Sequence, residues 1–187
     1  MHEVHILGSI QGYSDFSEGD VGLQCSYKIH TSHAPKQPAA ANNHHSSSSP
    51  IWIKLNGNPS GTTQLHYSPD SSMSSGTWNH PIDIQYATTG ILGWPQIQFE
   101  IWSEDKWRRR SFVGYGSHYP LLLTTTPGGK NQNEVDVVIW RPCDTFFDNV
   151  RAYFMGGRRV GEFVACQGEN ESVGVLHLKL DVLVTTL

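Results

Sequence analysis

A tryptophan followed by three arginines, Trp107, Arg108, Arg109 and Arg110, is the group of side chains in this 187-residue chain best suited to binding. At a loop tip, the indole could enter the headgroup layer of an anionic membrane. The guanidinium groups would then contact phosphates, and each basic residue contributes about 1 kcal/mol. Aromatic and arginine side chains are also enriched in protein interfaces. Three interpretations stay open: a partner contact, a membrane contact, or a solvated charged turn.

Ten histidines invite a metal hypothesis. His30 and His33 lie three residues apart, and His44 and His45 follow, but these two stand in a low-complexity segment with no fixed geometry. A closed zinc site needs four ligands at defined distances. The three cysteines are widely spaced and form no CxxC pair. We therefore expect no metal and no cofactor, with reduced cysteines as in an intracellular protein.

The spacing of the candidate residues gives little support for an enzymatic function. A covalent mechanism needs a nucleophile, a base and a group that orients the base. The chain has no GxSxG elbow and no phosphate-binding GxxxxGK[ST] loop. Gly156 and Gly157 follow an aromatic run instead of opening a helix, so they do not form a phosphate cradle. We expect that the protein is not an enzyme.

The elements that would position these groups are mostly strands. Ile82, Ile84 and Tyr86 alternate with polar residues, and so do the apolar residues at 97–101, with a turn-rich joint at 90–95 between them. Pro81 and Pro95 suit strand starts, because proline cannot donate to a ladder. Further strands are predicted near 4–10, 23–29, 51–55, 112–116, 135–139, 162–165 and 176–184.

Helical spacing replaces the alternation in one place. The aromatic and apolar residues with helical spacing are Phe146, Phe147, Val150, Tyr153 and Phe154. About eight strands and one short helix predict an all-β fold, an antiparallel β-sandwich. Four tryptophans, Trp78, Trp94, Trp102 and Trp140, are expected to pack the sandwich.

A segment at 34–76 is rich in Ser, Asn, Pro and Gly and poor in apolar bulk. We interpret it as a low-complexity insertion within a single domain that spans 1–187, because long surface insertions cost little stability. The net charge of −4 disfavours a nucleic-acid binder. No apolar run reaches the roughly 18 residues of a membrane span. Met1 leads directly into strand-like sequence, so we expect no signal peptide.

The stretch from Trp78 to Asp105, WNHPIDIQYATTGILGWPQIQFEIWSED, resembles the signature of the B9-domain family of ciliary transition-zone proteins. Within that motif we interpret His80 as structural, fixing the turn into the strand. The similar elements are Trp78, His80–Asp83, Ala87–Thr88, Gly90, Gly93–Pro95, Phe99 and Trp102–Ser103, and beyond the stretch Glu3–Gly8, Gly114–Gly116, Trp140–Pro142 and Gly174–Leu180.

B9 domains are regarded as C2-like, so the resemblance implies a C2-like β-sandwich. The stretch WSEDKWRRRSFVG resembles the third top loop of calcium-binding C2 domains, where several aspartates supply ligands. Here Ser103 and Ser111 stand at the first and last acidic positions, and only Asp105 remains. Calcium needs six to eight oxygens, several of them from carboxylates. We therefore expect no calcium site in this loop, which disfavours a calcium-dependent signalling domain.

The resemblance also implies a function. It indicates a non-catalytic scaffold subunit of a tectonic-like (MKS) complex, which assembles with sibling B9-domain proteins and transition-zone membrane-associated proteins. Its expected place is the cytoplasmic side of the ciliary base, at the transition zone, basal body and cytoskeleton, where it would support ciliogenesis and the diffusion barrier. The alternative is a calcium-independent module for anionic lipid. Trp107 to Arg110 are candidate contacts from their chemistry, not from the family.

Overall fold

The computed structural model describes residues 1–16, 21–31, 52–67, 75–90, 92–120, 133–142 and 170–186. Every regular element within those ranges is a β-strand, and all strand pairs are antiparallel. The strands are β1 His2–Ser14, β2 Gly22–His30, β3 Trp52–Gly57, β4 Ser60–Thr62, β5 His66–Tyr67, β6 Gly76–Thr88, β7 Gln96–Glu104, β8 Arg110–His118, β9 Glu134–Pro142 and β10 Asn170–Thr186.

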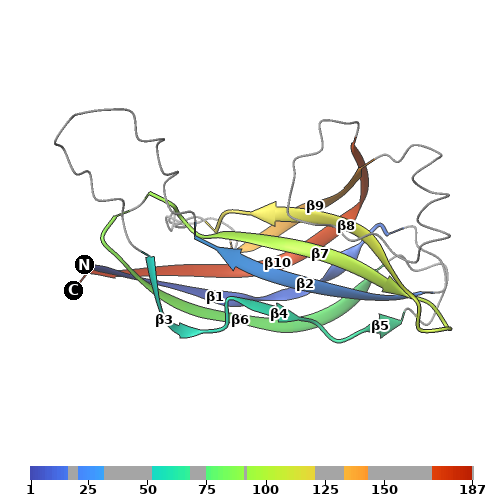
Figure 1. Ribbon diagram of the computed structural model, residues 1–187, viewed down its shortest axis with the longest axis horizontal. Coiled ribbons are helices and arrows are strands. Elements are labelled where there is room, and N and C mark those ends of the chain that lie inside the picture. The colour runs from blue at the N-terminus through green and yellow to red at the C-terminus, as the bar shows by residue number, and fades with distance from the viewer. Residues whose placement is uncertain are drawn as a thin grey trace, which may run out of the picture.

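The strands follow the order β3-β6-β1-β10-β9-β8-β7-β2-β4, and β5 pairs with β2. The sheet curls so that its two halves face each other (Figure 1). Tyr27 of β2 and His80 of β6 come from opposite halves, and their ring centroids are 5.8 Å apart. The prediction of an all-β, antiparallel, C2-like β-sandwich is therefore confirmed.

The core lies between the two halves. Ile6 and Ile10 of β1, Ile84 of β6 and Phe99 of β7 are almost completely buried. These residues occupy the inward positions of the alternating runs, as period two requires. Burial of each such side chain stabilises the fold by about 1.5 to 3 kcal/mol. Cys25 is also buried here, and burial raises the pKa of its thiol.

Pro81 does not begin a strand, so that prediction is wrong. It lies inside the 13-residue strand β6, opposite Ser9 of β1. Proline is tolerated there because β3 pairs with β6 only between Ile84 and Thr88, so that among the described strands Pro81 has a partner on one side alone. Pro95 does stand directly before β7, as predicted.

Three residues lie differently from what the sequence predicted for them: His80, Trp102 and Trp140. His80 does not fix a turn, because it lies within β6 with its ring against Tyr27. Trp78 is buried as predicted, but the side chain of Trp140 is 42% exposed. Trp102 points outward, because its neighbours along the strand, Ile101 and Ser103, are buried. Its half-buried ring packs against Phe112, and the two ring centroids are 5.4 Å apart.

Residues 52–67 form three short strands, two of them where no strand was predicted. Trp52 of β3 is buried and donates its indole N–H to the backbone oxygen of Leu92 at 2.7 Å. Its ring makes edge-on contacts with Tyr86 and Trp94, at 6.0 and 5.6 Å between centroids. These contacts attach β3 to the core. The predicted helix at 146–154, the strand at 162–165 and residues 34–50 lie outside the described ranges.

Candidate functional site

The candidate residues Trp107 to Arg110 lie in the hairpin between β7 and β8, and Asp105 organises its loop. One carboxylate oxygen of Asp105 accepts the backbone N–H groups of Trp107 and Arg109, at 2.8 and 2.9 Å. The other oxygen accepts Nε of Arg109 at 2.7 Å. Two backbone bonds between Asp105 and residues 108 and 109 close the turn. Arg108 takes a left-handed conformation with φ of 60°.

These contacts set the charge of Asp105. The pKa of its carboxyl is lowered, chiefly by the hydrogen bond from the Arg109 backbone N–H, with further contributions from the Arg109 side chain and the Trp107 backbone. Both carboxylate oxygens are therefore engaged within the loop. Ser103 and Ser111 lie opposite each other, and the Ser103 hydroxyl donates to the Ser111 backbone oxygen at 3.4 Å. The loop presents hydroxyls where calcium would need carboxylates.

Replacement of Asp105 by alanine is expected to loosen this hairpin. Amide hydrogen exchange at Trp107 and Arg109 should become severalfold faster, because both N–H groups lose their acceptor, while exchange in the buried strands stays the same. Asp105→Asn is the matched variant, since it keeps an acceptor oxygen but loses the charge. Its effect should be smaller.

The lowered pKa makes the same contact dependent on pH. A carboxyl group whose pKa is lowered in the folded state stabilises the fold fully at pH values above its unfolded pKa of about 3.9. This stabilisation is lost as the pH falls through the pKa of the folded state. NMR titration should therefore place the Asp105 transition below the ordinary range, and Arg109→Ala should raise it. A transition at or above the ordinary range would show that Asp105 does not hold the loop.

The four predicted residues share this hairpin but do not form one cluster. Trp107 is 80% exposed. Arg108 is exposed, and its guanidinium has no hydrogen bond or ion pair with any residue that the structure describes. Arg109 is bound to Asp105. Arg110 turns back along the sheet, donates to Gln24, and lies 6.0 Å from the centroid of the Trp102 ring.

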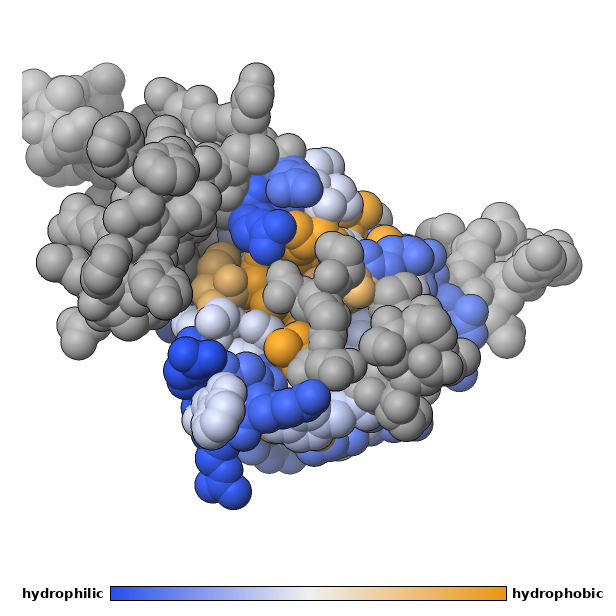
Figure 2. All heavy atoms as spheres, turned by 90° about the vertical axis from the view of Figure 1, so that its right-hand side faces the viewer, coloured by the Kyte–Doolittle hydropathy of each residue, from blue (hydrophilic) through white to orange (hydrophobic). Residues whose placement is uncertain are grey.

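Trp107 and Arg108 are therefore the tip of the loop. The hairpin lies at the right-hand end of Figure 1, opposite the chain termini. Figure 2 looks at that end, where strongly hydrophilic side chains gather beside apolar ones. Such a combination is able to bind either an anionic surface or a protein.

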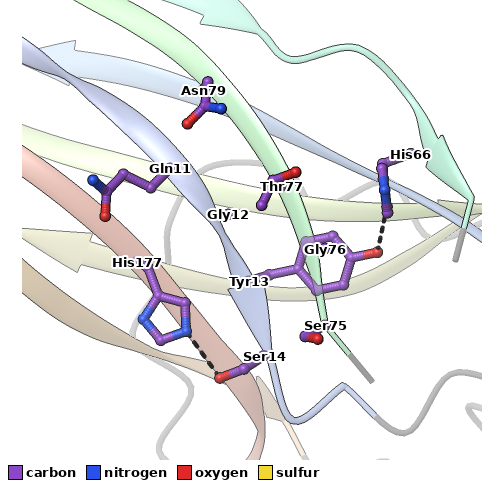
Figure 3. A pocket seen from close by; sticks show the side chains of 10 residues that line it. All are labelled: Gln11, Gly12, Tyr13, Ser14, His66, Ser75, Gly76, Thr77, Asn79 and His177. Carbon is purple, nitrogen blue, oxygen red and sulfur yellow. Dashed lines mark hydrogen bonds between the residues drawn. The ribbon is translucent and has the colours of Figure 1, made fainter. Parts of the chain in front are cut away.

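A second feature, which sequence reasoning missed, is an open pocket of about 610 Å³ between β1, β5, β6 and β10 (Figure 3). The Tyr13 hydroxyl and Nδ1 of His66 are 3.1 Å apart across it. Burial raises the pKa of Tyr13. His66 and Tyr13 are 53 residues apart, and β5 is only two residues long, so no local pattern indicated this contact.

Beside the pocket, Ser14, His177 and Asp136 form a chain of polar contacts. Nε2 of His177 is 3.0 Å from Oγ of Ser14, and Nδ1 is 2.6 Å from a carboxylate oxygen of Asp136. In a catalytic triad, serine directs its proton to the histidine and the acid is buried. Here the Ser14 hydroxyl donates to Asp15 at 3.1 Å, and the side chain of Asp136 is 71% exposed. This arrangement favours a surface network that joins β1, β10 and β9.

Among the exposed apolar side chains of the described strands, five lie at three places on the sheet. Trp140 and Val138 lie on β9, at 42% and 39% exposure, and Ile53 lies on β3 at 49%. The third place is the end of β10, where Leu183 is 56% and Val184 40% exposed. Val184 is partly exposed, because the described part of β9 pairs with β10 only as far as Glu134, opposite Lys179.

Neither a metal-binding cluster nor a membrane-spanning helix occurs among the described residues. No group of three His, Cys, Asp or Glu side chains there is arranged to hold a metal ion. No helix in those ranges is long and apolar enough to span a membrane. His33, His44 and His45, which belonged to the metal hypothesis, lie outside them.

Comparison with known proteins gives consistent matches. The family model "Ciliary basal body-associated, B9 protein" matches residues 4–183. B9 domain-containing protein 2 of Rattus norvegicus is 34% identical over 158 residues, which cover 84% of this chain and 74% of the relative. The Homo sapiens protein of the same name is also 34% identical over the same shares. B9 domain-containing protein 1 of Mus musculus is 27% identical over 125 residues, 65% of this chain and 58% of the relative.

Proposed function

Because the chain belongs to the family of ciliary basal body-associated B9 proteins, we propose that it is a non-catalytic scaffold subunit of a complex at the ciliary transition zone. It assembles with sibling B9-domain proteins and with membrane-associated proteins on the cytoplasmic side of the ciliary base. Through this assembly it supports ciliogenesis and the diffusion barrier.

The exposed apolar side chains of the sheet are the observation that carries this proposal. The core is closely packed, yet Leu183, Ile53 and Trp140 are 56%, 49% and 42% exposed. Exposed apolar groups on an ordered sheet are typical of surfaces that bind other proteins. The Asp136 side chain of the Ser14–His177–Asp136 network is 71% exposed, whereas the acid of a catalytic triad is buried, so binding is a better account of the surface than catalysis.

Affinity purification of the tagged protein from ciliated cells, followed by mass spectrometry, tests the proposal. We expect recovery of sibling B9-domain proteins and transition-zone membrane proteins, and location of the tagged protein at the ciliary base. Recovery of neither group, with the tagged protein located elsewhere in the cell, would overturn the proposal.

A second candidate function is calcium-independent binding to anionic lipid. It is favoured by the hairpin tip, where Trp107 is 80% exposed and the Arg108 guanidinium has no hydrogen bond or ion pair with a described residue. Tryptophan suits the membrane interface, and each basic residue near an anionic surface adds about 1 kcal/mol. The net charge of −4 opposes such binding, so it would depend on this one end of the molecule.

Charge reversal at the tip tests lipid binding. Arg108→Glu is expected to reduce co-sedimentation with phosphatidylserine-containing vesicles severalfold at low salt, because two units of charge change at the contact. Arg141→Glu, which makes the same charge change on β9, should have little effect. Absence of wild-type binding at low salt, or equal loss in both variants, would exclude the tip as a lipid anchor.

A further inference from the structure

Asn56 and Gly57 are the last two residues of β3, and they are the one Asn-Gly pair in the chain. Asparagine is a chemically labile residue. The backbone nitrogen of the following residue can attack its side-chain amide, and glycine allows the closest approach because it has no side chain. The attack forms a five-membered succinimide ring, which water opens to aspartate or isoaspartate. In a folded protein the reaction depends on where the fold holds the two groups.

The structure holds the two reacting groups together. The Gly57 backbone N–H donates to Oδ1 of Asn56, and the nitrogen lies 2.8 Å from that oxygen. Oδ1 is bonded to Cγ, the carbon that the nitrogen would attack. The nitrogen therefore lies close to the separation of about 3 to 3.5 Å from which intramolecular reactions begin. The contact joins adjacent residues, so ring formation needs no rearrangement of the sheet.

The amide group that would leave is free of protein contacts. Asn56 is exposed, and its Nδ2 donates to no residue that the structure describes. β3 is the outermost described strand beside β6, and its register shifts between Lys54 and Asn56. A bulge disrupts the ladder locally. Water and hydroxide can therefore reach both the leaving amide and the Gly57 N–H.

Packing requires glycine at position 57. Gly57 has a φ of 85°, in the left-handed region that residues with a side chain rarely adopt. A Cβ on Gly57 would overlap the backbone oxygen of Asp83 and lie 2.8 Å from Cα of Ile84. The close approach of β3 to β6 therefore excludes the larger residues that would slow ring formation.

We propose that Asn56 is a site of spontaneous deamidation in the folded protein. A bond forms between the Gly57 nitrogen and Cγ of Asn56, and the bond from Cγ to Nδ2 breaks. The proton of the Gly57 N–H passes through water to Nδ2, which leaves as ammonia. Water then adds to one of the two ring carbonyls. Opening at one carbonyl gives aspartate, and opening at the other gives isoaspartate, in which the backbone passes through the side chain.

The isoaspartate product would loosen a connection between the two halves of the sandwich. The end of β3 pairs with β6, whereas β4 pairs with β2 in the other half (Figure 1). Between them, the Pro59 backbone oxygen accepts the Ile29 N–H at 2.6 Å. Isoaspartate adds one methylene to the backbone at residue 56, so amide exchange at Ile29 is expected to become faster. The aspartate product keeps the backbone length and should leave that exchange unchanged.

Asn58 is a matched control within the same chain segment. It is exposed and lies two residues from Asn56, but Pro59 follows it and has no N–H to lose. The purified full-length protein is incubated at mildly alkaline pH, digested and analysed by mass spectrometry. We expect the mass gain of amide-to-carboxylate conversion at Asn56 and none at Asn58. Synthetic peptides that carry aspartate or isoaspartate identify the two products by chromatography.

The variant Asn56→Gln keeps an amide but must form a six-membered ring, which is slower. The mass gain at this position should therefore be lost, while thermal melting shows that the variant is folded. A gain at residue 56 equal to that of wild type would mean that water hydrolyses the amide directly, without attack by the Gly57 nitrogen, and would contradict the mechanism.

The same protein unfolded in guanidinium chloride supplies the reference rate. Conversion of folded Asn56 within about tenfold of the unfolded rate supports the inference, because global unfolding would populate the reactive state far less often. A larger reduction would mean that the pair reacts only after the structure opens, and would overturn the inference. Earlier conversion at Asn58 or at the exposed Asn79, neither of which precedes glycine, would also overturn it.

Discussion

Trp52→Ala is expected to lower the free energy of unfolding by about 4 kcal/mol. The indole is buried among Tyr86 and Trp94, and its N–H satisfies the Leu92 backbone oxygen at 2.7 Å. Alanine leaves a cavity at the end of the core and an unpaired carbonyl. Urea denaturation of the purified protein would measure the loss.

The neighbouring residue supplies the control for Trp52. Ile53 is 49% exposed, so Ile53→Ala should cost less than about 1 kcal/mol. Trp52→Phe keeps an aromatic ring but loses the donor, and its cost should fall between the two. If Trp52→Ala changed the free energy of unfolding only slightly, β3 would not stabilise the fold and residues 52–67 would not contribute to the core.

Gly8→Ala is expected to cost about 3 kcal/mol and to lower the melting temperature by roughly 6 to 12 °C. Strands β1 and β10 approach closely at this position. A Cβ on Gly8 would overlap the backbone oxygen of Lys179 and lie 2.9 Å from Cα and Cδ2 of Leu180. Backbone atoms cannot rotate away, so the central β1–β10 pair would have to separate.

Ser9→Ala tests whether this cost is specific to the close approach. Ser9 is the next residue of β1, pairs with Lys179 in the same ladder and is only partly buried. Its replacement should change stability by no more than about 0.5 kcal/mol. Equal stability of Gly8→Ala and wild type would contradict the β1–β10 packing. Gly8 also belongs to the residues that resemble the B9 family, and the close approach supplies a physical reason for glycine at that position.

The strands with clear alternation could be predicted from the sequence. One face of each strand meets the core, so the alternating apolar residues lie inward: Ile6, Ile10, Ile82, Ile84, Leu176, Leu178 and Leu180. Between residues 52 and 67, the strand near 51–55 was predicted and corresponds to β3, but β4 and β5 could not be predicted in this way. The strands in this range are two to six residues long, and the burial of Trp52 depends on Tyr86 and Trp94, which are distant in sequence.

Candidate site residues could be predicted in type but not in arrangement. The sequence indicated a hairpin with Trp107 and three arginines, yet it did not show that Asp105 binds Arg109 or that Arg110 turns toward Gln24. Those contacts depend on a left-handed Arg108 and on the β7–β2 register.

The proposed scaffold function requires that the chain binds a sibling B9 domain, and the most direct measurement is sedimentation velocity of the purified chain with purified B9 domain-containing protein 1. We predict a hetero-oligomer at micromolar concentration that persists at moderate salt, because exposed apolar groups contribute to the contact. Independent sedimentation of the two proteins, together with salt-sensitive binding of this chain to anionic vesicles, would contradict the scaffold account and support a separate lipid-binding module.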